Sequence, residues 1–227
     1  TLRALKMHGG VPKQELSTEN VEAVTNGFSN LQKAIENMRY FNVPVLVAIN
    51  KFATDTDAEI AELTRLCDEF GVPVELNECW EKGGEGGTDM AKKVVELLEG
   101  PKPTPKFVYD LEDTLEDKVN KIVKTIYGGD GVIFTDKAKK QIKQLADWGL
   151  DRLPVCMAKT QYSLSDNPAL LGAPTGFTIT VSDIRIANGA GFIVCRTGDV
   201  MVMPGLPKRP AALNMDIEAD GTIKGLF

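Results

Sequence analysis

A continuous apolar segment at residues 45–49, followed by the start pattern of a helix, constrains the fold of this chain most. Such a segment with β-branched members is typical of a strand that is buried on both faces, as in a parallel sheet. Thr56 and Glu59 then form a capping box, which begins a helix, and Gly71 is placed to end that helix. A further strand is expected at residues 72–76. Strand, helix and strand in this order predict a right-handed βαβ unit.

The flanking segments extend this alternation of helices and strands. Apolar residues recur at steps of three and four over 21–38, which predicts a long amphipathic helix that ends before Pro44. A glycine-rich loop then precedes a helix predicted over 88–98, with Thr88 as its cap. We therefore expect residues 1–100 to form part of a doubly wound, mostly parallel sheet that resembles the sheet of P-loop NTPases.

Three prolines between residues 101 and 105 interrupt the pattern and predict a stiff, extended connector. We place a boundary there, so that residues 101–227 form a smaller C-terminal α+β subdomain. Asp136 is the predicted cap of a helix, and Asp220-Gly221 is a hairpin turn signal. The remaining predicted elements of this part are helices over 115–126 and 136–148 and strands over 132–134, 154–158, 177–181, 184–186 and 192–194.

Composition and charge exclude several classes of protein. The chain has 227 residues and a formal net charge of -6, which argues against a nucleic-acid partner. No apolar run approaches the ~20 residues that span a bilayer, so we expect no membrane partner. The cysteines form no CxxC pair, and the lone His8 cannot complete a zinc set. We expect no metal site and a cytoplasmic protein with reduced, mostly buried thiols at Cys67, Cys79, Cys156 and Cys195.

Two familiar phosphate-binding motifs do not occur in the sequence. It contains no GxxxxGK[ST], and no GxGxxG opens a helix after a strand. The nearest imitation is the glycine-rich segment 82–88, whose backbone amides at a helix start are able to hold an anion. Glu85 lies inside that segment and would repel a phosphate, so a flexible turn is the favoured interpretation.

Two aromatic residues stand at the predicted carboxyl ends of neighbouring strands, where ligands of parallel sheets commonly bind. Phe52 lies in the polar loop 50–57, and Trp80 follows the strand predicted at 72–76. The run Asn50-Lys51-Phe52-Ala53 is similar to the NKxD motif of GTPases, but Ala53 replaces the carboxylate that grips guanine. The two rings either sandwich a flat heterocycle or simply cap the sheet, and periodicity favours neither interpretation.

Matched segments occur in order over nearly the whole chain: Thr1 to Gly10, Ala48 to Thr56, Trp80 to Gly87, Val155 to Ser163, Met203 to Pro207 and Gly225 to Phe227. Together they resemble the formate–tetrahydrofolate ligase family and the matching domain of the trifunctional C1-tetrahydrofolate synthases. The resemblance implies an enzyme that joins formate to tetrahydrofolate with ATP hydrolysis, through formyl phosphate. It also implies that the pterin stacks against Phe52 and Trp80, and that Leu76 lines the pocket. Asn50 and Asp55 flank Phe52 in the matched loop and complete the predicted substrate-binding set.

The resemblance also leads to expectations about completeness and partners. The family's ATP-binding motif and its other, lysine- and glycine-rich signature lie before the segment that matches Thr1. We therefore expect the chain to be a C-terminal portion of the enzyme, with no catalytic residues of its own, inactive alone and without a tightly bound cofactor. ATP and Mg would belong to the full-length enzyme, and the partners would be the missing N-terminal part and further copies in a homo-oligomer. The alternative is a non-catalytic α/β ligand-binding or interaction module, whose Phe52 and Trp80 pocket would not bind folate.

Two groups of charged residues complete the predictions. The first ten residues are expected to form a loop in which Arg3, Lys6 and His8 contact the folate or an anion, or merely hold the loop to the sheet. Charges of both signs between Asp113 and Lys124 form one face of a predicted helix, which we expect to be solvated.

Overall fold

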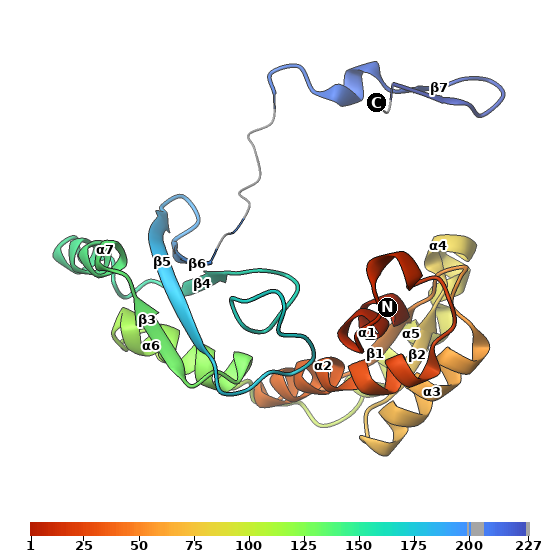
Figure 1. The fold of residues 1–227 in the computed structure, drawn as a ribbon, viewed down its shortest axis with the longest axis horizontal. Helices are drawn as coiled ribbons and strands as arrows, with labels where there is room; N and C mark the ends of the chain where they lie inside the picture. Colours follow the sequence, from red (N-terminus) through yellow and green to blue (C-terminus); the bar gives the residue numbers. More distant parts are fainter. Residues whose placement is uncertain (199, 201–206, 226–227) are drawn as a thin grey trace.

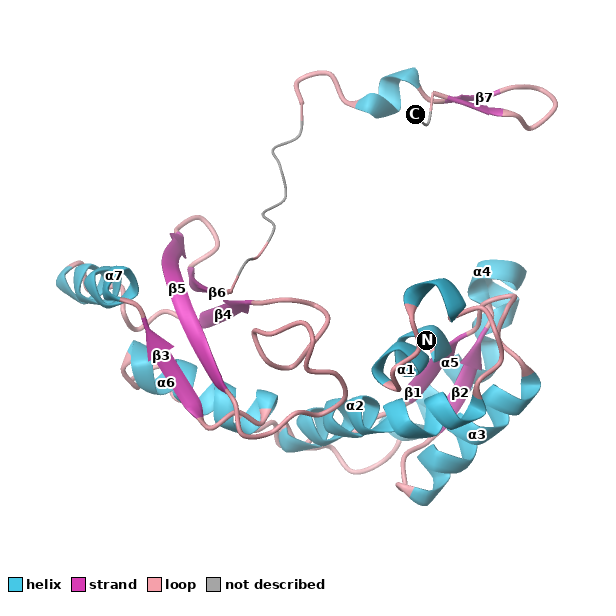
Figure 2. Ribbon diagram, in the orientation of Figure 1, coloured by secondary structure: helices cyan, strands magenta, loops and turns pink. Residues whose placement is uncertain are grey.

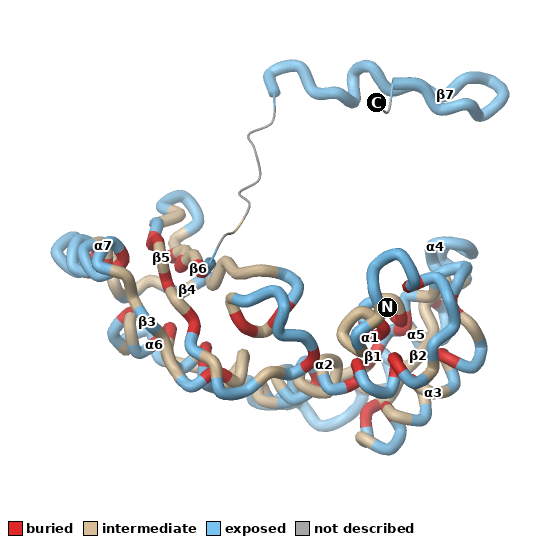
Figure 3. Tube along the Cα trace, in the orientation of Figure 1, coloured by how far each residue is buried: buried red, intermediate tan, exposed pale blue. Residues whose placement is uncertain are grey.

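The computed structural model describes residues 1–198, 200 and 207–225, and its mixture of helices with parallel and mixed sheets confirms the α/β class (Figure 1). Two separate hydrophobic cores organise it. The N-terminal core lies among the helices and the parallel strands of the first 98 residues, and the C-terminal core lies around a mixed sheet after residue 114. Figure 3 shows the buried residues gathered in these two groups.

The chain begins with a helix, so the prediction of a loop at residues 1–10 is wrong. α1 (Leu2–His8) is capped by Thr1, whose Oγ1 accepts a hydrogen bond of 3.2 Å from the amide of Ala4. Leu2, Leu5 and Lys6 are buried, at the spacing of one helical face. Seven residues are too short to show a repeating apolar stripe, which is why the pattern did not reveal the helix.

α2 (Val21–Tyr40) follows a short turn, η1 (Lys13–Glu15), and packs closely on α1. A Cβ atom at Gly27 would lie 1.9 Å from the carbonyl oxygen of Leu5, so this approach of two backbones requires glycine. The predicted amphipathic helix over 21–38 is confirmed, and it ends before Pro44 as expected.

A parallel βαβ unit forms the centre of the N-terminal core. β1 (Val47–Asn50) and β2 (Val74–Asn77) pair in parallel, with Asn50 opposite Asn77, and α3 (Asp57–Glu69) connects them. The capping box of Thr56 and Glu59 is present, and Gly71 has a positive φ of 69°. In Figure 2 the two strands lie side by side among the helices. Within the described residues these two strands form a two-stranded sheet, so the doubly wound, P-loop-NTPase-like sheet that we predicted is not confirmed.

The glycine-rich segment after β2 has more structure than a flexible turn. It continues the short helix α4 (Cys79–Lys82) as a 3-10 helix, η2 (Gly83–Gly87), and leads into α5 (Thr88–Leu98). The cap position of α5 is Gly87, without a side-chain cap, so Thr88 begins the helix and does not cap it. Residues 99–114, with the three prolines, contain neither helix nor strand; the boundary placed there stays a prediction.

The C-terminal core is built on a four-stranded sheet in the order β3-β5-β6-β4. The outer pairs are parallel and the central pair is antiparallel. Residues 178–187 form one continuous strand where we predicted two, and Thr135, not Asp136, caps α7. The elements are α6 (Leu115–Ile122), the π-helical turn η3 (Val123–Tyr127), β3 (Gly131–Phe134), α7 (Asp136–Asp147), β4 (Val155–Ala158), β5 (Thr178–Ala187) and β6 (Phe192–Thr197).

The last described segment contains a 3-10 turn, η4 (Ala211–Asn214), and the predicted hairpin. β7 (Asp216–Ile217) and β8 (Ile223–Lys224) pair in antiparallel fashion, and Gly221 in the turn has a φ of 86°. The prediction of a hairpin at Asp220-Gly221 is therefore confirmed. Residues 203–206 of the matched segment 203–207 lie outside the described residues.

Two predictions about burial need correction. Cys67 and Cys195 are buried, but Cys79 and Cys156 are exposed, so only half of the thiols belong to the core. Lys118, predicted on a solvated face, is fully buried. Its position on the inner face of α6, beside the buried Leu115 and Val119, overrides the polar character of the surrounding sequence.

Candidate functional site

A half-open cleft of about 350 Å³ lies at the carboxyl ends of β1 and β2. This volume is within the range of small-molecule sites, and the end of a parallel strand pair is a common place for one. Its walls come from α1, from the turn after β1 and from the end of β2 with α4. The lining residues are Arg3, Asn50, Lys51, Phe52, Ala53, Thr54, Asn77 and Trp80.

Two aromatic rings give the cleft its apolar surface. Trp80 on α4 is 88% exposed, and Phe52 in the turn after β1 is 44% exposed. Apolar rings that share a cleft and remain accessible are typical of a binding surface. The guanidinium carbon of Arg3 lies 5.5 Å from the centre of the Phe52 ring, which is a cation–π contact. The N-terminal helix therefore contributes directly to the cleft.

The turn that carries Phe52 is closed by Asp55. The carboxylate oxygen Oδ2 of Asp55 accepts a hydrogen bond of 2.9 Å from the Phe52 amide, and the Asp55 amide donates at 2.9 Å to the Phe52 carbonyl. Asp55 is only 7% exposed and is not among the lining residues. It therefore positions Phe52 and does not face the cleft.

A pair of amides forms the polar part of the cleft. The Nδ2 of Asn77 donates a hydrogen bond of 2.7 Å to the Oδ1 of Asn50, its partner across the two strands. The Oδ1 of Asn77 in turn accepts from the amide of Cys79 at 3.1 Å, at the start of α4. A side-chain amide carries two donors and an acceptor, so this pair retains capacity to bind a polar heterocycle edge.

The lysine in the cleft already has a carboxylate partner, which it shares with a second lysine. Lys51 pairs with Glu78 at 3.0 Å, and Lys82 pairs with the other oxygen of Glu78 at 2.6 Å. Hydrogen bonds from Lys82 and Lys51 hold the pKa of Glu78 below its usual range, and the bond to Glu78 raises the pKa of Lys51. Arg3 is the cleft cation that forms no salt bridge within the described part of the chain.

The structure brings most of the predicted binding residues together. Asn50, Phe52 and Trp80 line the cleft, and Asp55 supports it from behind. Leu76 instead packs against the N-terminal core and is not among the lining residues. Asn77 was missed, although its place one residue after Leu76, at the end of the same strand, was the available signal.

The other basic residues of α1 have structural roles. Lys6 is fully buried and pairs with Glu59 at 2.8 Å. The Nδ1 of His8 accepts a hydrogen bond of 3.0 Å from the Gly172 amide, and burial lowers the pKa of His8. The sequence allowed these residues either to contact a ligand or to hold the segment in place. Lys6 and His8 hold the segment in place, whereas Arg3 faces the cleft.

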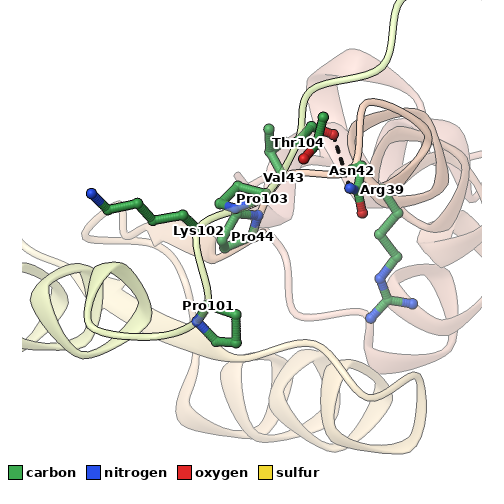
Figure 4. A pocket seen from close by; sticks show the side chains of 8 residues that line it. All are labelled: Arg39, Asn42, Val43, Pro44, Pro101, Lys102, Pro103 and Thr104. Atoms are coloured by element: carbon green, nitrogen blue, oxygen red, sulfur yellow. Dashed lines mark hydrogen bonds between the residues drawn. The ribbon is translucent and has the colours of Figure 1, made fainter.

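A larger cavity of about 670 Å³ lies at the proline connector (Figure 4). Arg39, which lines it together with Lys102, donates to the carbonyl of Gly71 at 2.7 Å and lies over the Phe70 ring at 5.0 Å. Asn42 donates to the carbonyl of Thr104 at 2.9 Å. These groups tie the connector and the end of α3 to α2, so the cavity is a weaker candidate than the aromatic cleft.

Neither a metal site nor a membrane-spanning helix is found in the part of the chain that the structure describes. There, no group of three or more histidine, cysteine, aspartate or glutamate side chains is arranged to hold a metal ion. None of the described helices is both long enough and apolar enough to cross a membrane.

The βαβ unit and its aromatic, amide-lined cleft define an α/β protein with a candidate small-molecule site at the ends of parallel strands. The family model of formate–tetrahydrofolate ligase matches residues 1–227, and the chain belongs to that family. This membership supports a formate–tetrahydrofolate ligase enzyme, whose substrates are formate, tetrahydrofolate and ATP.

Proposed function

We propose that the cleft at the ends of β1 and β2 binds the pterin ring of tetrahydrofolate for the formate–tetrahydrofolate ligase reaction. The observation that carries the proposal is the presence of two accessible aromatic rings, Phe52 and Trp80, on one cleft of suitable volume. A pterin is flat and aromatic, and offset stacking adds about 0.5–1.5 kcal/mol per ring pair beyond the burial of area.

The polar groups of the cleft complement the same ligand. A pterin carries ring nitrogens, an amino group and a carbonyl, and therefore needs donors and acceptors along one edge. The amides of Asn50 and Asn77 supply both kinds of group at the end of the strand pair. Arg3 adds donors on the side of Phe52.

The cleft does not suit a nucleotide triphosphate. Phosphoryl transfer depends on cations that hold the phosphate oxygens. Lys51 is already paired with Glu78, so Arg3 alone in the lining is left to face three phosphates. We assign ATP and Mg to residues other than those of this cleft, so that the cleft serves the folate side of the reaction.

Three expectations rest on the resemblance and the composition alone. They are assembly into a homo-oligomer, a cytoplasmic location, and the division of the chain into parts 1–100 and 101–227. We carry them as parts of the proposal, to be tested by sedimentation, by localisation and by limited proteolysis.

Calorimetric titration with a stable folate analogue tests the proposal. We expect saturable binding that Phe52→Leu weakens about 2- to 13-fold, the range that one lost stacking contact predicts. Phe107→Leu is the matched control, because Phe107 is exposed and lies outside the lining of the cleft. Absence of binding, or equal weakening by both variants, would contradict the proposal and favour a non-catalytic module.

A further inference from the structure

A buried ion pair joins α1, which lines the cleft, to α3, which follows the turn that carries Phe52. The Nζ of Lys6 on α1 lies 2.8 Å from Oε1 of Glu59 on α3, and both side chains are fully buried. Lys6 also donates to the carbonyl of Thr18 at 3.1 Å. Separating a pair withdrawn from water in this way is strongly unfavourable, because it leaves a buried charge unpaired.

Glu59 is connected to more than its lysine. Its Oε1 accepts from the Asn20 amide at 2.8 Å, at the start of α2, and its Oε2 accepts from the Thr56 amide at 3.2 Å. Burial alone would raise the pKa of Glu59, but the bonds from Lys6, Asn20 and Thr56 outweigh it, so the pKa is lowered and the carboxylate is charged. One carboxylate thus ties the starts of α2 and α3 to α1.

The connection continues to the cleft through adjacent residues. Thr56 follows Asp55 directly, and Asp55 holds the Phe52 amide through its side chain. Arg3 lies on the same short helix as Lys6 and contacts the Phe52 ring at 5.5 Å. The ion pair therefore fixes, from behind, the relative placement of the two side chains that meet at the cleft.

We propose that Lys6 and Glu59 are positioning residues for ligand binding, which act by holding Arg3 on α1 and Phe52 on the turn before α3 in register. This inference rests on the proposed function for the identity of the ligand. The effect of the ion pair on the Arg3–Phe52 contact does not depend on that ligand. The pair does not touch the cleft, since neither residue is among the lining residues.

The test uses K6M/E59Q, in which neither residue is charged and the side-chain volumes are nearly kept. The amide group that E59Q introduces presents donors where the carboxylate accepted from backbone N–H groups, so the turn loses an anchor. The matched control is K93M/E96Q, the same exchange at the more exposed Lys93–Glu96 pair on α5, whose separation is 2.9 Å. Circular dichroism establishes that each variant is folded at the assay temperature.

Two readouts separate positioning from the ligand hypothesis. In the first, the dissociation constant for the folate analogue is expected to rise about tenfold in K6M/E59Q and to stay within about twofold in K93M/E96Q. In the second, 4-fluorophenylalanine at position 52 reports the Arg3 contact by fluorine NMR without any ligand. We expect its resonance in K6M/E59Q to move to the position that Arg3→Met produces.

Either readout can overturn the proposal. A folded K6M/E59Q protein with an unchanged fluorine resonance, or with unchanged affinity where the wild type binds, would show the pair to be structural only. If the wild type does not bind the analogue, the proposed function fails, and the fluorine readout still decides the positioning role. Should K6M/E59Q not fold, K6M/E59L, which replaces the pair with apolar side chains and leaves no charge buried without a partner, carries both readouts.

Discussion

Each of the two cores contains one fully buried lysine, and the two are stabilised in different ways. Lys6, in the N-terminal core, pairs with the buried carboxylate of Glu59. Lys118, in the C-terminal core, donates instead to the carbonyls of Asp151 at 3.1 Å and Leu153 at 3.2 Å. The core that carries the cleft has an ion pair, and the other core uses neutral acceptors.

The comparison shows what a buried charge contributes in each place. The Lys6–Glu59 pair joins the last turn of α1 to the starts of α2 and α3 near the cleft, so its geometry is transmitted to Phe52. Lys118 closes the loop before β4, and burial, followed by the nearby Arg152, lowers the pKa of Lys118. The first lysine positions a candidate site, whereas the second stabilises a loop that does not line the cleft.

The largest expected effect comes from Glu59→Leu. This variant leaves the Lys6 ammonium buried without a carboxylate, which costs about 3–5 kcal/mol of unfolding free energy. The double variant K6M/E59L removes the charge as well and is expected to recover most of that loss. Urea unfolding followed by circular dichroism measures both; a loss below about 1 kcal/mol in the single variant would contradict the role of the pair.

Lys118→Met is expected to have a smaller effect. The substitution leaves two backbone carbonyls without their donor but leaves no unpaired charge, so the expected loss is about 1–3 kcal/mol. Lys124→Met, at an exposed position after α6, is the control and is expected to stay within about 0.5 kcal/mol. If Lys118→Met costs as much as Glu59→Leu in the same urea experiment, the contrast between the two lysines is wrong.

The contact between α1 and the loop at Gly172 is expected to depend weakly on pH. His8 accepts from the Gly172 amide and is therefore neutral, and burial lowers its pKa from the usual 6.5. The unfolded chain takes up a proton near pH 6.5 while the folded chain does so at lower pH, so stability is full above that range and falls as the pH drops through it.

His8→Asn retains an acceptor but does not titrate, and it is a clean comparison because the chain has one histidine. The urea midpoint of the wild type, relative to that of His8→Asn, is expected to decrease between about pH 7.5 and pH 5.5. Parallel pH profiles of the two proteins would exclude His8 as a sensor of that contact.

The local elements were largely predictable because their signals are local. The capping box of Thr56 and Glu59, the turn at Gly71 and the strand at β3 each depend on a few neighbouring residues. The exposed aromatic residues Phe52 and Trp80 were also found, because an aromatic residue in a polar loop breaks the apolar pattern.

The remaining features depend on contacts between distant segments. Lys6 and Glu59 are 53 positions apart, so no local pattern shows that they pair. A helical interpretation of residues 2–8 would have placed Lys6 on the buried face with Leu2 and Leu5, but a seven-residue helix gives too little periodicity. Leu76 lies on the face of β2 that packs against the N-terminal core, and therefore away from the cleft. The resemblance did not reveal this orientation.

A titration that observes Trp80 alone tests the central claim most directly. Trp148→Phe leaves Trp80 as the only tryptophan, and Trp80→Phe provides the matched correction for absorption by the ligand. With a stable folate analogue we predict saturable quenching of the Trp80 emission, shifted to higher ligand concentration by Phe52→Leu. An unchanged Trp80 emission at concentrations where calorimetry shows the analogue to be bound would contradict the claim that the pterin occupies this cleft.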